Sequence, residues 1–262
     1  MITLVEAPEQ DAVLDAVSLD GNFDQKKGGI QIEREGYGNC TLGFNVRFTA
    51  GSVYYPGFVT NSHCTRTFGG AEATRFFQPS IGTYTKIGVE ISDPPFLQAT
   101  AGCPLGARCR YSDAALVSYD TGIPWAGASI ARTNYYDPTY GSLVIDFENP
   151  QFTVTDDYYI LEGYRIDKIG ATSGWTYGLL EESCFDTLTT GGSSDYMLLC
   201  QYRSSNGMAP GDSGSPVFYW NGGSQVTLIG LARGFTNSRM TFSNFYDIKD
   251  ELGFYPWQIS GF

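Results

Sequence analysis

Short stretches of alternating apolar and polar residues, separated by turns rich in Gly and Pro, run along most of the chain. Residues 40–49 alternate cleanly, with an apolar side chain at every second position from Leu42 to Phe48. This period predicts a half-buried strand. A second strand is predicted at 53–60, although Pro56-Gly57 interrupts its apolar run. Further short strands are predicted at 87–91, 114–117, 143–145, 152–154, 165–170, 217–220 and 226–229. The hairpin signal Asn221-Gly222-Gly223 joins the last two.

Helical spacing appears only near the C-terminus, where Phe245, Ile248 and Leu252 fall on one face. The polar pair Ser243-Asn244 offers a cap at the start of this helix, and Gly253 can end it. Many short strands, abundant turns and one terminal helix predict an all-β fold with two similar-sized halves. No internal repeat or low-complexity tract indicates a solenoid or a disordered tail.

The same patterns suggest how the chain is divided. Residues 1–27 are acidic and weakly patterned, and we interpret them as an N-terminal arm or covering segment. Residues 120–141 are rich in Gly, Pro, Ala and Tyr without clear periodicity, which places the linker between the halves there. We therefore expect a first half over 28–130 and a second over 131–262.

Charge and cysteine content narrow the class of protein. The formal net charge of −12 argues against nucleic acid or an anionic membrane as partner. Six Cys in a chain rich in Gly and Tyr suit an oxidised, secreted β protein with three disulfides. Cys103 and Cys109 are close enough in sequence to pair, and Cys184 and Cys200 flank a Gly/Ser turn that predicts a disulfide across a hairpin.

Cofactor and targeting signals are weak. The chain has one His and no C-x-x-C pair, so a structural zinc site is not expected. Calcium at Asp156-Asp157, or at Asp247 and Asp250, is a weaker interpretation than a solvated acidic face. The start lacks a basic region and a long apolar core, so it has the form of a mature chain without a signal peptide. No run approaches the ~18 apolar residues of a membrane span, which predicts a soluble protein.

Candidate chemistry lies at Ser213, which directly follows Gly211-Asp212 and precedes Gly214. Such a turn can expose the hydroxyl and direct backbone N–H groups toward one point, as nucleophilic acyl transfer requires. A plain surface turn is the alternative, because these residues are common turn formers. A serine nucleophile also needs a base, and His63 is the chain's only histidine.

Three motifs, at residues 60–64, 112–117 and 211–216, resemble those of the chymotrypsin-like serine proteases. Thr60-Asn61-Ser62-His63-Cys64 is similar to their Thr-Ala-Ala-His-Cys element, and residues 211–216 are similar to Gly-Asp-Ser-Gly-Gly-Pro. Between them, residues 112–117 are similar to Asp-Ile-Ala-Leu-Leu. The order His, Asp, Ser differs from that of subtilisins and α/β-hydrolases. Three further segments resemble the secreted bacterial branch, the streptogrisin-like and α-lytic-like enzymes: residues 29–30 followed by 40–45, residues 168–176, and residues 241–242 with 247–253. The resemblance covers roughly residues 28–262, except for the linker at 121–141.

The resemblance implies two six-stranded antiparallel Greek-key β-barrels with the active site between them and a C-terminal helix. It makes Ser213 the nucleophile, His63 the general base and then acid, and Asp113 the residue that orients His63. The N–H groups of Gly211 and Ser213 would form the oxyanion hole. Asp93 and Asp120 are alternatives to Asp113, but neither is followed directly by a short apolar strand.

The resemblance also implies two supporting contacts. Asp212 needs a cationic partner, for which the bacterial relatives use an internal basic residue. Lys168 stands at the expected position, with Arg165 second, although both could be ordinary solvated charges. A disulfide between Cys40 and Cys64 would hold the strand that leads to His63.

Four residues bear on the specificity pocket. Gly207 stands where trypsin-like members carry an Asp, so a preference for Lys or Arg is not expected. Met208 aligns with a pocket Met of α-lytic-like enzymes, although it could simply pack in the core. Arg233 and Phe235 depart from the small residues usual along the substrate strand. Arg233 could attract an acidic substrate residue, neutralise Asp113 from behind, or point to solvent, and Phe235 could narrow the groove.

The sequence therefore predicts a secreted, monomeric serine endopeptidase that acts on polypeptides without metal or cofactor. Cleavage after an apolar or small residue is the first expectation, and cleavage after an acidic residue the second. One alternative is a catalytically silent homologue that uses the scaffold as a binding module, but all three triad residues are present. An esterase or lipase is disfavoured by the triad order and by Ser215, which replaces the last Gly of the Gly-x-Ser-x-Gly motif.

Overall fold

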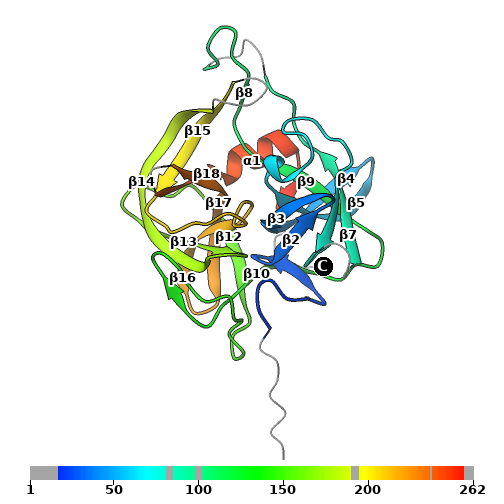
Figure 1. Ribbon diagram of the computed structural model, residues 1–262, viewed down its shortest axis with the longest axis vertical. Coiled ribbons are helices and arrows are strands. Elements are labelled where there is room, and N and C mark those ends of the chain that lie inside the picture. Colours follow the sequence, from blue (N-terminus) through cyan, green and yellow to red (C-terminus); the bar gives the residue numbers. More distant parts are fainter. Residues whose placement is uncertain (1–16, 81–84, 98–101, 190–194, 237, 257–262) are drawn as a thin grey trace, which may run out of the picture.

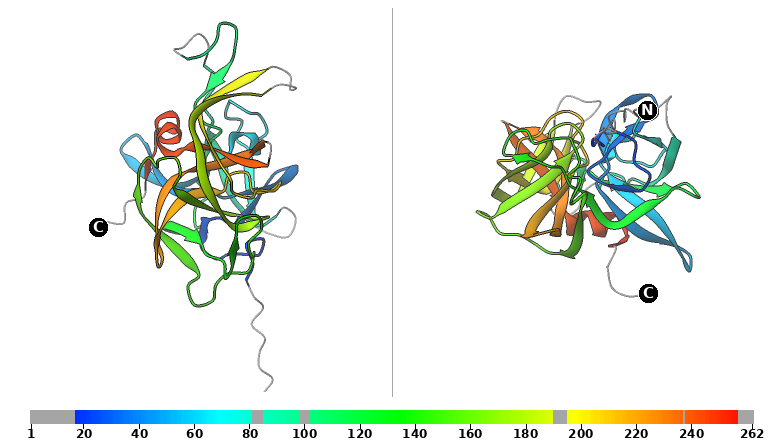
Figure 2. Two further views of the ribbon diagram at one scale, coloured as in Figure 1. Left: turned by 90° about the vertical axis from the view of Figure 1, so that its left-hand side faces the viewer. Right: turned by 90° about the horizontal axis from the view of Figure 1, so that it is seen from below.

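The computed structural model describes residues 17–80, 85–97, 102–189, 195–236 and 238–256. Two β-rich halves lie side by side, with a short helix near their junction (Figure 1). The view from below shows the same division (Figure 2). The predicted all-β class is thus confirmed.

The first half is built on an eight-stranded sheet whose pairings are all antiparallel. In spatial order its strands are β19 (Tyr255–Pro256), β4 (Phe44–Ala50), β5 (Val53–Thr60), β9 (Ala115–Tyr119), β7 (Thr85–Ser92), β6 (Arg75–Gln78), β2 (Gln31–Arg34) and β3 (Tyr37–Thr41). The short edge strands β3 and β19 raise the number of strands above the six expected.

Six strands of the second half close into a ring, because β18 pairs back onto β17. Around the ring they are β17 (Gln225–Thr236), β16 (Pro216–Gly222), β13 (Arg165–Gly170), β14 (Gly174–Thr189), β15 (Tyr196–Ser204) and β18 (Arg239–Asn244). This is the predicted six-stranded barrel. Five further strands attach to it, with parallel pairings as well as antiparallel ones: β1 (Lys26–Gly28), β8 (Cys109–Arg110), β10 (Trp125–Ala131), β11 (Tyr136–Asp137) and β12 (Gln151–Asp157).

The strand predicted over residues 40–49 is two strands, β3 and β4, separated at Gly43. The chains approach closely there: a Cβ atom on Gly43 would lie 2.7 Å from the carbonyl oxygen of Val59 and 2.4 Å from Leu231 Cδ1. The contact requires glycine and interrupts the pairing. The apolar positions Leu42, Phe44 and Val46 are buried as predicted, but Thr41 and Asn45 on the opposite face are buried as well, so the expectation of a half-buried strand is wrong there.

Two segments interpreted as breaks contain strands. β5 runs through Pro56, because this proline lies just outside the stretch that pairs with β9, where its missing N–H is not needed. The segment 120–141 contains β10 and β11, and β10 pairs with β1 and β12. These strands lack a clear period because their partners come from distant parts of the chain.

The C-terminal helix forms where it was predicted. In α1 (Phe245–Leu252), the side chain of Asn244 accepts a hydrogen bond from Asp247 N at 3.0 Å, and Gly253 ends the helix in the left-handed region, with φ 64°. Its apolar face is buried, and the ring of Phe245 lies 5.6 Å from that of Phe44 in the first half. The helix therefore packs against the first half. No helix among the described residues has the length and hydrophobicity needed to span a membrane.

The described part of the predicted arm covers the barrels as a packed segment. Leu19 is fully buried and Phe23 nearly so. Backbone hydrogen bonds join Leu19 N to the carbonyl oxygen of Leu143 at 2.9 Å and Gln31 N to the carbonyl oxygen of Leu19 at 2.8 Å. Residues 1–16 of the arm lie outside the described residues.

Three disulfides are present, and they are the pairs expected. Cys40–Cys64 joins β3 to the 3₁₀ turn η1 (Ser62–Cys64), Cys103–Cys109 closes a small loop, and Cys184–Cys200 links β14 to β15. The first bond holds the segment that contains His63.

Candidate active site

His63 lies in η1, directly after the buried end of β5. Its neighbours fasten this turn to the segment before β9. The side chain of Asn61 donates a hydrogen bond to the carbonyl oxygen of Asp113 at 2.7 Å, and Ser62 N donates to the same oxygen at 3.4 Å. These contacts with the Asp113 backbone hold His63 beside Asp113 in addition to the contact between their side chains.

Asp113 is fully buried and is the aspartate that contacts His63. His63 Nδ1 lies 2.7 Å from Asp113 Oδ2, and His63 N donates to Oδ1 at 3.0 Å. Of the two alternatives, Asp93 pairs with Arg110 at 2.6 Å and Asp120 with Lys86 at 3.2 Å.

The charge state of Asp113 follows from its partners. Burial alone would raise the pKa of this carboxyl group, but the charges and hydrogen bonds of His63 and Arg233 hold it well below its usual range. Arg233 Nε lies 3.1 Å from Asp113 Oδ2, and Asp113 N donates to Ser243 Oγ at 3.1 Å. The site therefore contains a buried, ionised carboxylate.

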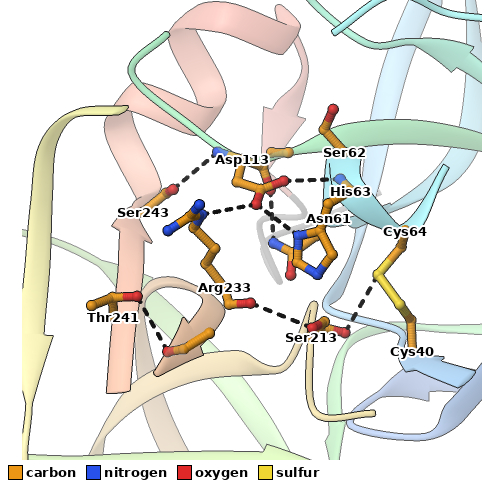
Figure 3. Close-up of polar contacts among 12 residues, drawn as sticks. Cys40, Asn61, Ser62, His63, Cys64, Asp113, Ser213, Arg233, Thr241 and Ser243 are labelled. Atoms are coloured by element: carbon orange, nitrogen blue, oxygen red, sulfur yellow. Dashed lines mark hydrogen bonds and ion pairs between the residues drawn. A yellow bond between two sulfur atoms is a disulfide. The ribbon is translucent and has the colours of Figure 1, made fainter. Parts of the chain in front are cut away.

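Ser213 lies in a tight turn just before β16, beside the His63–Asp113 pair (Figure 3). The flanking Gly211 and Gly214 have φ angles of 101° and 89°, which favour glycine at both positions. The hydroxyl of Ser213 donates a long 3.4 Å hydrogen bond to the carbonyl oxygen of Arg233. Because Nδ1 of His63 faces Asp113, Nε2 is the ring nitrogen left to take a proton from a nucleophile.

The N–H groups of this turn divide into two sets. Those of Asp212, Gly214 and Ser215 donate to carbonyl oxygens at 2.9 to 3.0 Å. Within the part of the chain that the structure describes, no group accepts a hydrogen bond from the N–H of Gly211 or Ser213. These two donors are therefore available to an external oxygen atom.

A buried ion pair holds the turn from behind. Lys168 Nζ lies 3.2 Å from Asp212 Oδ2, both side chains are fully buried, and the hydroxyl of Ser173 donates to the same oxygen at 2.5 Å. Burial raises the pKa of Asp212, but the Lys168 charge and the hydrogen bonds outweigh it and lower the pKa. Arg165, the second expected partner, instead pairs with Asp167 at 2.6 Å.

A pocket of about 270 Å³ opens beside the pair; its walls are His63, Tyr196, Arg233, Gly234, Phe235 and Thr241. Two of the four predicted pocket residues, Arg233 and Phe235, thus lie there. Met208 instead packs against the core of the second barrel. Gly207 lies against the 138–141 segment, where a Cβ atom would come within 2.0 Å of the carbonyl oxygen of Thr139.

Some residues of the site were not predicted from the sequence. Tyr196 enters the pocket from β15 and Thr241 from β18. Glu251 on α1 accepts hydrogen bonds from Tyr111 N at 2.8 Å, Ser112 N at 2.9 Å and Ser112 Oγ at 2.6 Å, and so holds the segment before Asp113. No local motif marks these positions, because their partners are far away in the chain.

Solved structures share this architecture. Protease A of Thermobifida fusca matches with a TM-score of 0.58 and 21% identity, over 87% of this chain and 96% of that one. Cellulomonas bogoriensis chymotrypsin matches with a TM-score of 0.57 and 17% identity, over 88% of this chain and 97% of that one. A serine protease described as glutamic acid specific matches with a TM-score of 0.59 and 19% identity, over 87% of this chain and 98% of that one. The chain has the chymotrypsin fold. No family model matches the sequence, and no curated protein matches it either.

Within the chymotrypsin fold, the candidate residues come from both barrels. His63 follows β5 and Asp113 precedes β9, and both strands belong to the first sheet. Ser213 precedes β16 of the second sheet. Across the described ranges, no three His, Cys, Asp or Glu side chains cluster so as to hold a metal ion.

Proposed function

We propose that the chain is a secreted serine endopeptidase. The observation that carries the proposal is the pair of His63 and buried, ionised Asp113 beside Ser213 in a chymotrypsin fold. Three disulfides support an oxidising, extracellular location. A polypeptide is the substrate, and the monomeric state expected from the sequence stays a prediction.

In the proposed reaction, Ser213 Oγ attacks the carbonyl carbon of the peptide bond while His63 Nε2 takes its proton. Asp113 orients the ring through Nδ1 and stabilises the imidazolium that forms. The N–H groups of Gly211 and Ser213 bind the oxyanion. The C–N bond breaks as His63 donates this proton to the leaving amine, and the acyl group stays on Ser213 Oγ as an ester. A water molecule then attacks the ester carbon while His63 Nε2 takes its proton, and His63 returns a proton to Ser213 Oγ as the acid is released.

Lys168 supports the proposal as the partner that fixes the oxyanion loop. Its ammonium lies against Asp212, at the base of the turn that presents Gly211 and Ser213. A loop held by an internal ion pair needs no newly formed N-terminal amine to become competent. Preorganised donors of this kind account for a large share of the rate of acyl transfer.

We propose cleavage after an apolar or small residue. None of the residues that line the pocket offers a carboxylate to a Lys or Arg side chain, and the half-exposed ring of Phe235 gives the pocket an apolar wall. Against an acidic preference, the guanidinium of Arg233 already binds Asp113 and Tyr196. The neighbour described as glutamic acid specific uses a histidine triad in substrate binding, whereas this chain has a single histidine.

Cleavage of a peptide library by the full chain tests the proposal. Ser213→Ala is the matched control, since it removes one oxygen atom from the site. We expect the unmodified chain to cut after apolar or small residues and the variant to cut nothing. Absence of cleavage by the unmodified chain would favour the silent homologue, and cuts after Asp or Glu would overturn the proposed preference.

A further inference from the structure

Arg233 contacts both ends of the proposed triad. Its carbonyl oxygen accepts the hydrogen bond from the Ser213 hydroxyl, and its Nε donates to Asp113 Oδ2 at 3.1 Å. That carboxylate oxygen is the one 2.7 Å from His63 Nδ1, so the guanidinium and the imidazole share one acceptor (Figure 3). Arg233 on β17 therefore contacts both the proposed nucleophile, Ser213, and the aspartate of the triad, Asp113.

The guanidinium is fixed in this position. The Arg233 side chain is 14% exposed, and one of its terminal nitrogens donates to the Tyr196 hydroxyl at 3.1 Å. The ring of Tyr196 packs in turn against those of Phe68 and Phe96, with centroids 4.7 and 5.4 Å away, and these two rings also contact each other. Because these two Phe residues belong to the first half, the aromatic cluster ties Arg233 to both barrels.

We infer that Arg233 is a positioning residue of the triad that also sets the acid limit of the reaction. This inference rests on the proposed function. A protonated His63 would be a second cation on a carboxylate that already binds Arg233. The fixed charge thus opposes protonation of the base and keeps it available at lower pH, while the hydrogen bond holds Asp113 in line with the ring.

The other charged groups around the pair are engaged elsewhere. Behind Ser62, Asp93 pairs with Arg110. On α1, Glu251 accepts its hydrogen bonds from the segment before Asp113. β18 brings two neutral hydroxyls: that of Ser243 accepts from Asp113 N, and that of Thr241 donates to the carbonyl oxygen of Gly234. Apart from His63, Arg233 is the one cation within ion-pair distance of Asp113 among the described residues.

The expected effect is about one pH unit, or tenfold in the protonation equilibrium of His63. A charge at ~4–6 Å shifts a titration by about 1–3 units, and the lower end applies because the His63 side chain is 37% exposed and partly screened. Removal of the charge should therefore move the titration of His63 to higher pH. Exchange of Arg for another cation should not.

The single histidine makes this measurable without assignment, by NMR titration of the imidazole signals in the full chain. Arg233→Gln removes the charge but keeps a hydrogen-bond donor, and Arg233→Lys keeps the charge. Arg132→Gln is the matched control, because Arg132 is similarly buried, at 17% exposed, and pairs with Asp146, and neither residue lines the pocket. Arg233→Met is the second neutral variant if the first does not fold.

We expect the His63 midpoint, and the acid limb of kcat/KM with it, to rise by about one unit in Arg233→Gln. Both should stay in place in Arg233→Lys and Arg132→Gln. A midpoint in Arg233→Gln or Arg233→Met no higher than in Arg132→Gln would overturn the inference. If the unmodified chain cleaves nothing, the proposed function fails, but the titration still decides the effect of Arg233 on His63.

Discussion

Replacement of Lys168 by Met should uncouple folding from activity. Met keeps most of the side-chain volume and removes the ammonium that lies 3.2 Å from Asp212 Oδ2. The carboxylate of Asp212 then stays buried without a cation, although Ser173 Oγ, Ala209 N and two other backbone N–H groups still donate to it. The turn that carries Gly211 and Ser213 loses the ion pair at its base.

The size of the effect follows from this burial. Loss of one partner from a buried ion pair costs about 3–5 kcal/mol, and the remaining hydrogen bonds put Lys168→Met near the lower value. A single domain is typically stable by about 5–15 kcal/mol, so the variant should fold at 25 °C. Misplaced oxyanion donors cost about 100- to 1,000-fold in kcat.

Urea unfolding and peptide-cleavage kinetics measure the two effects separately. Arg165→Met is the control on the same strand, since Arg165 pairs with Asp167 rather than Asp212. We expect Lys168→Met to unfold cooperatively at lower urea with kcat reduced at least 100-fold, and the control to keep kcat within about threefold. A Lys168→Met variant with full kcat would show that the ion pair does not hold the oxyanion loop.

Two further predictions concern α1. Burial raises the pKa of Asp247 to about 6 from 3.8, so ionisation of this carboxyl group lowers the free energy of unfolding as pH rises through this window. After allowance for partial exposure, the free energy of unfolding of Asp247→Asn should exceed that of wild type by about 1 kcal/mol at pH 7. At pH 3 urea unfolding should show no difference. An equal gain at both pH values would refute this. Glu251→Ala should lower kcat about tenfold with KM unchanged, because the segment before Asp113 loses three hydrogen bonds; unchanged kcat would place Glu251 outside the machinery.

Local sequence patterns were sufficient to predict the features that depend on residues close together in the chain. The spacing of Phe245, Ile248 and Leu252 predicted α1, and the alternation after Cys40 predicted buried positions that are indeed buried. The turn around Ser213 was predictable because Gly211 and Gly214 have the positive φ angles that the turn requires.

Features that depend on distant segments could not be predicted. The break at Gly43 arises from contacts with Val59 and Leu231, and β10 is a strand because β1 and β12 flank it. For Arg233 the sequence left three possibilities open, and its contact with Asp113 depends on how β17 lies against the first half. Tyr196 enters the pocket for the same reason.

The central claim is that His63 activates Ser213. Intact-mass spectrometry after reaction with a fluorophosphonate tests it directly, because such reagents label an activated serine and not an ordinary hydroxyl. We expect one adduct, mapped to Ser213 by peptide analysis, with labelling lost in both Ser213→Ala and His63→Ala. An unlabelled wild-type chain, or an adduct that persists in His63→Ala, would contradict the account.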